Sequence, residues 1–294
     1  MKLLLATDFS DDAPAVDMVN ARPWPSGTEV CVLHVVDPDP FPPGAELLET
    51  ARRGAESVVK SIAAGLEPSG LKTQREVLVG YPRTAIVDFA GKWGADFILI
   101  GSHRTHNLAR LLLGSVAQAV VRAAPCSVEI VRRRAKNLSD AGSGWKILLA
   151  TDGSDCAKTA VRSAVERPWP TGTCVRVVSV VPLFMPIADA GTAYFDAAQA
   201  AETVRVVEDE LGLQAVEAIG QAEKTLRQAG SMQVEKTEPI SGDPKHVIVE
   251  EASKYGATMI VMGSHGRRGV DRLMMGSVSE FVASHAHCSV EVIR

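Results

Sequence analysis

A glycine- and serine-rich stretch, residues 263–279, carries the residue types best suited to binding an anion. Of its four glycines, three stand beside the other candidate residues, which are three arginines and a closing run of small residues: Gly263, Gly266, Arg267, Arg268, Arg272, Gly276, Ser277, Val278 and Ser279. Glycines let the backbone approach a ligand closely, and the first N–H groups of a helix are unpaired donors at the positive end of its dipole. Serine hydroxyls and guanidinium groups add hydrogen bonds to phosphate oxygens. Taken alone, the stretch also fits a turn followed by an ordinary Ser N-cap.

The segments on either side of this stretch predict the elements that would position it. Thr258–Met262 is an apolar run between glycines, which indicates a buried strand, and Val278–Ser284 indicates a helix preceded by hydroxyl residues. A strand, a glycine-rich loop and a helix N-terminus together form an anion site.

The same arrangement occurs a second time in the chain. Gly101-Ser102-His103 and Gly114-Ser115-Val116 have the same internal spacing as Gly263-Ser264-His265 and Gly276-Ser277-Val278. Three further pairs repeat: Lys2–Ser10 with Lys146–Ser154, Arg22–Pro25 with Arg167–Pro170, and Cys126–Glu129 with Cys288–Glu291. A repeat of roughly 145 residues is the size of a duplicated domain. We therefore predict two domains, residues 1–132 and 145–294, joined by a linker over 133–144.

Composition narrows the class of protein. The 294 residues carry 31 Lys and Arg against 35 Asp and Glu, so the chain lacks the basic surface expected of a nucleic-acid-binding protein. Asp8 ends the apolar start of the chain too early for a signal peptide, and no window approaches a membrane span. The five scattered cysteines lack metal-ligand spacing. We expect a cytoplasmic, reduced protein without a membrane or nucleic-acid partner.

Strand and helix patterns alternate along each half. In the first half, strands are predicted at Leu3–Thr7, Thr28–Val36, Lys72–Val79, Asp96–Ile100 and Ser127–Val131, and helices at Asp11–Asn20, Glu46–Ala64, Pro82–Lys92 and Ser115–Ala123. Such alternation predicts an α/β fold with a doubly wound, mainly parallel sheet.

The second half repeats this order with an insertion of roughly 17 residues before its third strand. Apolar residues recur at helical intervals over Asp196–Gln228, which predicts a helix even though Gly212 and Gly220 interrupt the pattern. Pro182–Pro186 and Gly191 predict a mobile loop leading into it.

The turn after the first strand of each half contains an acid where a dinucleotide-binding fold has glycines. Ligands of open α/β sheets bind beyond the carboxyl ends of the strands, where the strand order reverses. A carboxylate repels phosphate but accepts hydrogen bonds from an amino group or a sugar hydroxyl, so Asp152 and Asp8 suit the base or ribose end of a nucleotide. Each also fits the role of a helix cap or turn residue. Neither the P-loop nor the dinucleotide fingerprint follows the first strand of either half.

The spacing Gly263-x2-Gly266-x9-Gly276-Ser277, with Thr151-Asp152-Gly153-Ser154 after the first strand, resembles the ATP-binding signature of the universal stress protein family. The resemblance covers nearly the whole chain as two tandem domains. It implies, in each half, a five-stranded parallel sheet flanked by helices, Rossmann-like and similar to the adenine nucleotide alpha hydrolases. It also implies ATP or another adenine nucleotide, with Mg²⁺ on the phosphates. Asp152 and Val180 would contact adenine, Gly263 would contact ribose, and Gly266, Gly276, Ser277, Val278 and Ser279 would contact phosphates.

The first half departs from this signature. Arg104 stands at the second glycine and Ala117 at the position of Ser279. The residues that remain for a weaker site are Asp8, Val35, Gly101, Gly114 and Ser115. We therefore expect nucleotide chiefly in the second half.

Catalysis is not predicted from these residues. His103 and His265 lie beside the loop glycines, but a catalytic histidine needs an orienting acid and a positioned substrate. His285 and His287 lack the third ligand of a zinc site. The leading interpretation is an ATP-binding regulatory protein of the stress response. Two alternatives are a slow ATP hydrolase or nucleotidyl-transfer enzyme using the same site, and an interaction scaffold that binds no nucleotide.

The last strand of each half, Ser127–Val131 and Ser289–Ile293, is expected at a sheet edge, where unpaired backbone groups favour pairing with another strand. The family resemblance suggests that such edges pair across a dimer axis. In a tandem chain the two halves would pair with each other as an intramolecular pseudo-dimer; a homodimer is the other arrangement of these edges.

Overall fold

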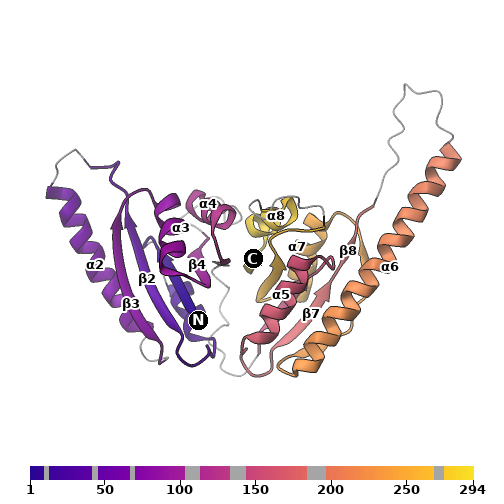
Figure 1. The fold of residues 1–294 in the computed structure, drawn as a ribbon, viewed down its shortest axis with the longest axis horizontal. Helices are drawn as coiled ribbons and strands as arrows, with labels where there is room; N and C mark the ends of the chain where they lie inside the picture. Colours follow the sequence, from indigo (N-terminus) through magenta and orange to yellow (C-terminus); the bar gives the residue numbers. More distant parts are fainter. Residues whose placement is uncertain are drawn as a thin grey trace.

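In the computed structural model, the chain forms one continuous sheet that runs through both halves (Figure 1). The structure describes residues 1–9, 13–41, 46–66, 70–102, 113–132, 144–183, 197–267 and 275–294. The predicted linker, the predicted loop before the inserted helix, and Arg104, Arg268 and Arg272 lie outside these residues, apart from Gly144 and residues 182–183.

The first half alternates strands and helices as the hydrophobic pattern predicts. Its strands are β1 (Lys2–Thr7), β2 (Glu29–Val36), β3 (Lys72–Val79), β4 (Phe97–Gly101) and β5 (Ser127–Val131). Its helices are α1 (Ala13–Asn20), α2 (Glu46–Leu66), α3 (Pro82–Trp93) and α4 (Ser115–Ala123). The five strands are parallel in the order β3-β2-β1-β4-β5, which confirms the predicted doubly wound sheet.

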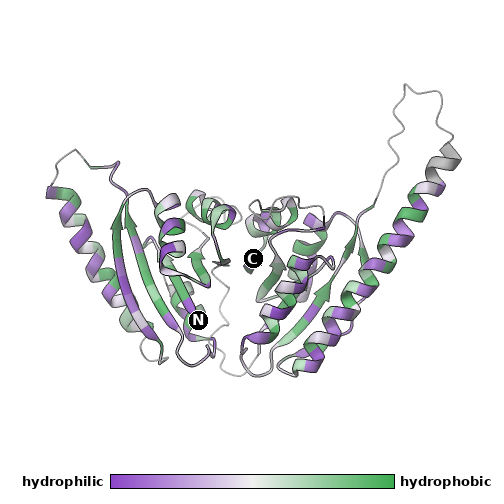
Figure 2. Ribbon diagram, in the orientation of Figure 1, coloured by the Kyte–Doolittle hydropathy of each residue, from purple (hydrophilic) through white to green (hydrophobic). Residues whose placement is uncertain are grey.

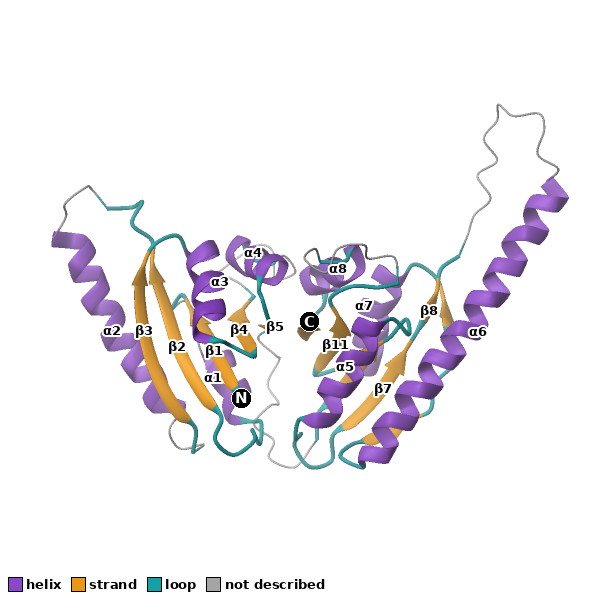
Figure 3. Ribbon diagram, in the orientation of Figure 1, coloured by secondary structure: helices purple, strands orange, loops and turns teal. Residues whose placement is uncertain are grey.

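The second half repeats this topology. Its strands are β6 (Lys146–Ala150), β7 (Cys174–Val178), β8 (Val180–Val181), β9 (Gln233–Glu235), β10 (Ile240–Ser241), β11 (Met259–Gly263) and β12 (Ser289–Ile293). Its helices are α5 (Asp155–Glu166), α6 (Ala197–Ala229), α7 (Pro244–Tyr255) and α8 (Ser277–His285). Five parallel strands lie in the order β12-β11-β6-β7-β9, and β8 pairs with β10 in a separate ladder (Figure 3).

The inserted segment forms α6, a single helix that passes through Gly212 and Gly220 without a break. Both glycines face open space, so they weaken helix propensity without disturbing any packing. Its inner face is buried at Ala215, Ile219 and Leu226. The N-terminal end of α6 extends past the strands, at the upper right of Figure 1.

Two hydrophobic layers cover the sheet, one on each face. Successive residues of a strand point to opposite faces, so Leu4 and Ala6 belong to the layer that α3, α4, α7 and α8 cover, whereas Leu3 and Leu5 belong to the layer that α1, α2, α5 and α6 cover. Each layer contains residues from both halves. Figure 2 shows hydrophobic colour along the central strands and mixed colour along α2 and α6. The core therefore passes through the junction of the halves.

The junction is an antiparallel pair of the two last strands. β5 and β12 pair with Val128 opposite Val292 and Ile130 opposite Val290. This arrangement confirms the expectation that the two edge strands pair with each other within the chain. The 1–132 and 145–294 domain boundaries stay a prediction.

Two carboxylates meet at the centre of this strand pair. Glu129 lies directly opposite Glu291, and both side chains are completely buried. Arg167 donates to both oxygens of Glu291 at 2.5 Å, and Arg22 donates to Glu291 at 3.1 Å and to Glu129 at 2.8 Å. The two arginines come from the repeated Arg-Pro-Trp-Pro segments that follow α1 and α5. This buried charge cluster joins the halves.

The two acids of the buried charge cluster have different partners. Glu291 accepts three hydrogen bonds, and its two arginines hold its pKa below the usual range. Glu129 Oε1 is buried and lacks a hydrogen-bond partner among the described residues. Burial raises the pKa of Glu129 to about 7, above its ordinary value of 4.5. Of the two acids, Glu129 is therefore the one that takes up a proton more readily.

This raised pKa predicts a pH dependence of stability. Between about pH 4.5 and 7 the folded state binds more protons than the unfolded chain, so Glu129 lowers the free energy of unfolding as pH rises through this window. Glu129→Gln has no such proton. We expect wild type to lose thermal stability relative to Glu129→Gln between pH 5 and pH 8, measured as the difference in Tm. Parallel pH profiles for the two proteins would contradict the assignment.

Candidate functional site

The predicted site lies where the strand order of the second half reverses. From β6 the chain proceeds outward to β7, whereas β11 lies on the opposite side of β6. The helix after β6, α5, packs on one face of the sheet, and the helix after β11, α8, packs on the other. The turn at 151–154 and the loop that starts at Ser264 therefore leave the sheet at adjacent carboxyl ends, where open α/β sheets bind ligands.

Asp152 joins this turn to this loop. Its Oδ1 accepts a hydrogen bond from the Ser154 N–H at 3.0 Å, and its Oδ2 accepts one from the Arg267 N–H at 3.0 Å. Ser154 then caps α5 by accepting a hydrogen bond from the Ala157 N–H at 3.2 Å. Asp152 has the turn role that the sequence left open, and each oxygen keeps a lone pair for a ligand. Its contact with adenine stays a prediction.

Each described glycine of residues 263–276 lies where a side chain would meet another group. A Cβ on Gly263 would lie 2.7 Å from the backbone carbon of Cys156 in α5, and one on Gly266 would lie 2.8 Å from Asp152 Oδ2. A Cβ on Gly276 would lie 3.2 Å from the carbonyl oxygen of Ser264. Gly263 is buried against α5, whereas Gly266 is exposed. The glycines thus let β11, its loop and α8 pack closely around the site.

The N-terminus of α8 has the properties of an anion site. Its N-cap residue is Gly276, which offers no side-chain hydrogen bond to the first turn, whereas Ser154 caps α5 and Asp243 caps α7. Ser277 is exposed and Val278 is half-buried. Among the described residues, no side chain caps the first N–H groups of α8, which lie at the positive end of the helix dipole.

Ser279 has a different environment from the one its predicted role needs. It is buried, and its hydroxyl donates to the carbonyl oxygens of Gly263 at 3.1 Å and Ser264 at 3.0 Å. Because a serine hydroxyl has one hydrogen, these bonds occupy it. Ser279 therefore supports the loop, and its hydroxyl is not proposed as a phosphate contact.

Arg267 lies against the turn at 151–154, and Val180 lies in β8. The Arg267 guanidinium lies over Gly153, with Nη2 at 2.9 Å from the Cβ position of that glycine, and Nη1 donates to Gln214 Oε1 of α6. Val180 in β8 is half-buried and pairs with Ile240 of β10. The sequence did not predict a role for Gln214, because nothing in the helical pattern of α6 distinguishes it from the other polar positions.

The first half shares part of this geometry. Gly114 is the N-cap of α4, and its N–H donates to the Ser102 carbonyl at 2.8 Å, as Gly276 does to Ser264. Ser115, Gly101 and Asp8 are exposed, whereas Val35 in β2 is buried.

The turn after β1 is where the two halves differ most clearly. Phe9 stands where the second half has Gly153, and its ring stacks on His34 at 3.8 Å between centroids. Phe9 thus occupies the position equivalent to Gly153, which Arg267 and α6 contact in the second half. The sequence analysis did not identify this difference between the halves.

The histidines form no catalytic group within the described residues. His265 Nδ1 shares a hydrogen bond with Ser264 Oγ at 2.8 Å, and its Nε2 is buried without a partner among those residues. Burial, with the nearby charge of Arg294, lowers the pKa of His265. His285 Nδ1 contacts the carbonyl of Phe281 at 2.9 Å. Within the part of the chain that the structure describes, no three His, Cys, Asp or Glu side chains form a metal site.

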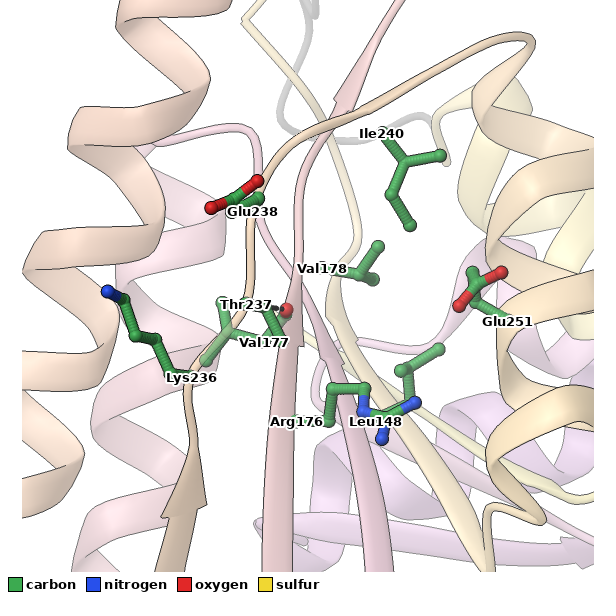
Figure 4. A pocket seen from close by; sticks show the side chains of 9 residues that line it. All are labelled: Leu148, Arg176, Val177, Val178, Lys236, Thr237, Glu238, Ile240 and Glu251. Atoms are coloured by element: carbon green, nitrogen blue, oxygen red, sulfur yellow. Dashed lines mark hydrogen bonds between the residues drawn. The ribbon is translucent and has the colours of Figure 1, made fainter.

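A cavity of about 190 Å³ lies beside this site, where β7 and β9 separate (Figure 4). Its lining comes from β6, β7, the segment that follows β9, β10 and α7: Leu148, Arg176, Val177, Val178, Lys236, Thr237, Glu238, Ile240 and Glu251. Lys236 and Glu251 lie on either side of the strands in Figure 4. None of the predicted site residues lines this cavity.

Comparison with known sequences places both halves in one family. The universal stress protein family model matches residues 1–132 and 145–294. Universal stress protein MJ0531 of Methanocaldococcus jannaschii is 35% identical over 144 residues, covering 46% of this chain and 84% of its own. Universal stress protein Rv2005c of Mycobacterium tuberculosis is 26% identical over 279 residues, covering 90% of this chain and 86% of its own.

Comparison of the fold with solved structures gives a match over the full length of the chain. A universal stress protein from Archaeoglobus fulgidus superposes with a TM-score of 0.68 at 22% identity, covering 100% of this chain and 98% of its own. No helix in the described ranges has both the length and the apolar character needed to cross a membrane. Matched by the family model in both halves, this chain belongs to the universal stress protein family.

Proposed function

We propose that the second half of the chain binds ATP or another adenine nucleotide, and that the protein acts in the cytoplasm as a regulatory protein of the stress response. One observation carries the proposal: the uncapped N-terminus of α8 lies at the strand-order reversal, beside the bridge between Asp152 and Arg267. Helix N-termini at this place in an α/β sheet suit phosphate groups.

The donors around this position favour a phosphate chain over a single carboxylate. The N–H groups at the start of α8 and the exposed Ser277 hydroxyl lie at one end of the 264–276 segment, and the Arg267 guanidinium comes from near its other end. Asp152 and Val180 are proposed for the adenine end, Gly263 for ribose, and Gly266, Gly276, Ser277 and the Val278 N–H for the phosphates. Mg²⁺ is proposed to arrive on those phosphates, and Arg268 is a further candidate cation.

The test is direct measurement of bound nucleotide. We expect mass spectrometry of ligand released from purified protein to detect an adenine nucleotide, and calorimetry of ligand-free protein to give one strong ATP site per chain. A protein that retains no nucleotide and gives no heat with ATP would be the scaffold of the third interpretation. Two equal sites would place a working site in the first half as well.

Turnover of ATP is expected to be negligible. Phosphoryl transfer to water needs a group that orients the nucleophile. Of the described candidates, His265 has its Nδ1 bonded to Ser264 and its Nε2 buried, and Asp152 is proposed for the adenine end, away from the phosphates. We expect ATP to stay intact over hours in a chromatographic assay with Mg²⁺. A steady-state rate above about one per second, within the ordinary enzyme range, would instead support the hydrolase alternative.

A further inference from the structure

The inserted helix α6 reaches the proposed nucleotide site at one turn of its inner face. Ala218 Cβ lies 3.2 Å from the position of a Cβ on Gly153, and Gln214, one turn earlier on the helix, accepts a hydrogen bond from Arg267 Nη1. Residues four apart lie on the same face of a helix. The side of the turn at 151–154 is therefore covered by α6.

Arg267 connects this helix to the loop after β11. Its backbone N–H donates to Asp152, while its guanidinium lies between Gly153 and α6. Gly153 has φ +75 and no side chain, which leaves room for the guanidinium. A single side chain thus links the loop, the turn and the inserted helix, although the three are far apart in the sequence.

We propose that Gln214 is a positioning residue that competes with nucleotide for Arg267. The inference rests on the proposed function, in which Arg267 is a phosphate contact. A guanidinium binds a phosphate through charge-assisted hydrogen bonds, which are stronger than its bond to a neutral carboxamide. Nucleotide therefore draws Arg267 away from Gln214, and the contact with Gln214 weakens nucleotide binding.

Because coupling between two equilibria is reciprocal, nucleotide also loosens α6 from the loop. The part of α6 that precedes Gln214 is well exposed: Val206 is 56% exposed and Leu213 is 73% exposed. Backbone amides there rely on few neighbours for protection. The effect of nucleotide on α6 is thus measurable over residues 197–214 by hydrogen exchange.

The sequence of α6 supplies a matched control. Gln214 donates to Glu210 four residues earlier, and Gln221 donates to Glu217 with the same spacing. Gln221 is exposed, and Gln221→Ala changes helix propensity by the same amount as Gln214→Ala. Of the two glutamines, Gln214 is the one that contacts Arg267.

The experiment is a double-mutant cycle read by calorimetry with ATP. We expect Gln214→Ala to bind ATP about threefold to tenfold more tightly, the worth of one modest hydrogen bond, and Gln221→Ala to match wild type. Arg267→Ala should bind more weakly, and adding Gln214→Ala to it should change nothing further. ATP should speed exchange over residues 197–214 in wild type and have less effect in Gln214→Ala.

Two results separate the inference from the function on which it rests. If wild type binds ATP but Gln214→Ala binds it equally or more weakly, the competition is wrong while the proposed function stands. The competition is also wrong if Gln214→Ala tightens binding equally with and without Arg267. If wild type gives no heat with ATP and retains none, both proposals fail.

Discussion

Glu291→Gln is expected to destabilise the protein by about 3–5 kcal/mol, the cost of removing one partner from a buried ion pair. The substitution keeps the shape of the side chain but removes the charge that Arg167 and Arg22 share. Both arginines stay buried, with exposed fractions of 4% and 5% for Arg167 and Arg22. Because β5 and β12 form the junction, we expect the loss to appear in denaturant unfolding of the whole chain.

Glu129→Gln is the matched control, since Glu129 lies opposite Glu291 at the same depth. It accepts one hydrogen bond from Arg22, and burial raises its pKa to about 7, so it is mostly protonated at pH 6. We expect a cost below about 1 kcal/mol at pH 6, where the change exchanges a protonated acid for an amide. Equal costs for the two substitutions would show that the cluster shares its charge evenly.

Gly276→Val is expected to abolish strong ATP binding, with a loss of affinity on the order of 100-fold or more. A Cβ there lies 3.2 Å from the Ser264 carbonyl and 3.5 Å from His265 Cα, and the branched side chain would cover the start of α8. Losing two charge-assisted hydrogen bonds to phosphate, each worth about 1.5 kcal/mol or more, gives a loss of this size. Calorimetry with ATP measures it.

Gly114→Val is the control for this change. Gly114 is likewise the N-cap of its helix, and a Cβ there lies 3.3 Å from the Ser102 carbonyl. The two substitutions should therefore cost similar stability, while only Gly276→Val should lose ATP. We expect the first half to contribute little binding, because Arg104 replaces a glycine and Phe9 takes the place of Gly153. If Gly114→Val alone removed strong ATP binding, the strong site would lie in the first half.

Element order and type were predictable from the sequence because they depend on local patterns. Apolar runs bounded by glycine or proline marked the strands of both halves, and helical periodicity marked α6 despite Gly212 and Gly220. The resemblance to the family, applied to a duplicated chain, suggested that the last strands of the two halves pair, and β5 pairs with β12 within the chain.

The composition of the junction could not be predicted in this way. The Arg-Pro-Trp-Pro and Cys-Ser-Val-Glu segments were visible as repeats, yet nothing local indicated that Arg22, Arg167, Glu129 and Glu291 meet. Their contact depends on the antiparallel register, which sets Glu129 opposite Glu291, and on the turns after α1 and α5, which bring both arginines to that point. A charged residue in a strand pattern otherwise predicts an exposed position.

The same distinction applies to the candidate site. By itself, the sequence determined the loop, its glycines and the acid after the first strand, because close backbone approach and helix N-termini have characteristic residue types and spacing. Only the tertiary structure decided that Ser279 supports the loop and that Gln214 of the inserted helix holds Arg267. Side-chain partners across separate elements follow from how helices pack on the sheet, and the spacing of residues along the chain does not encode that packing.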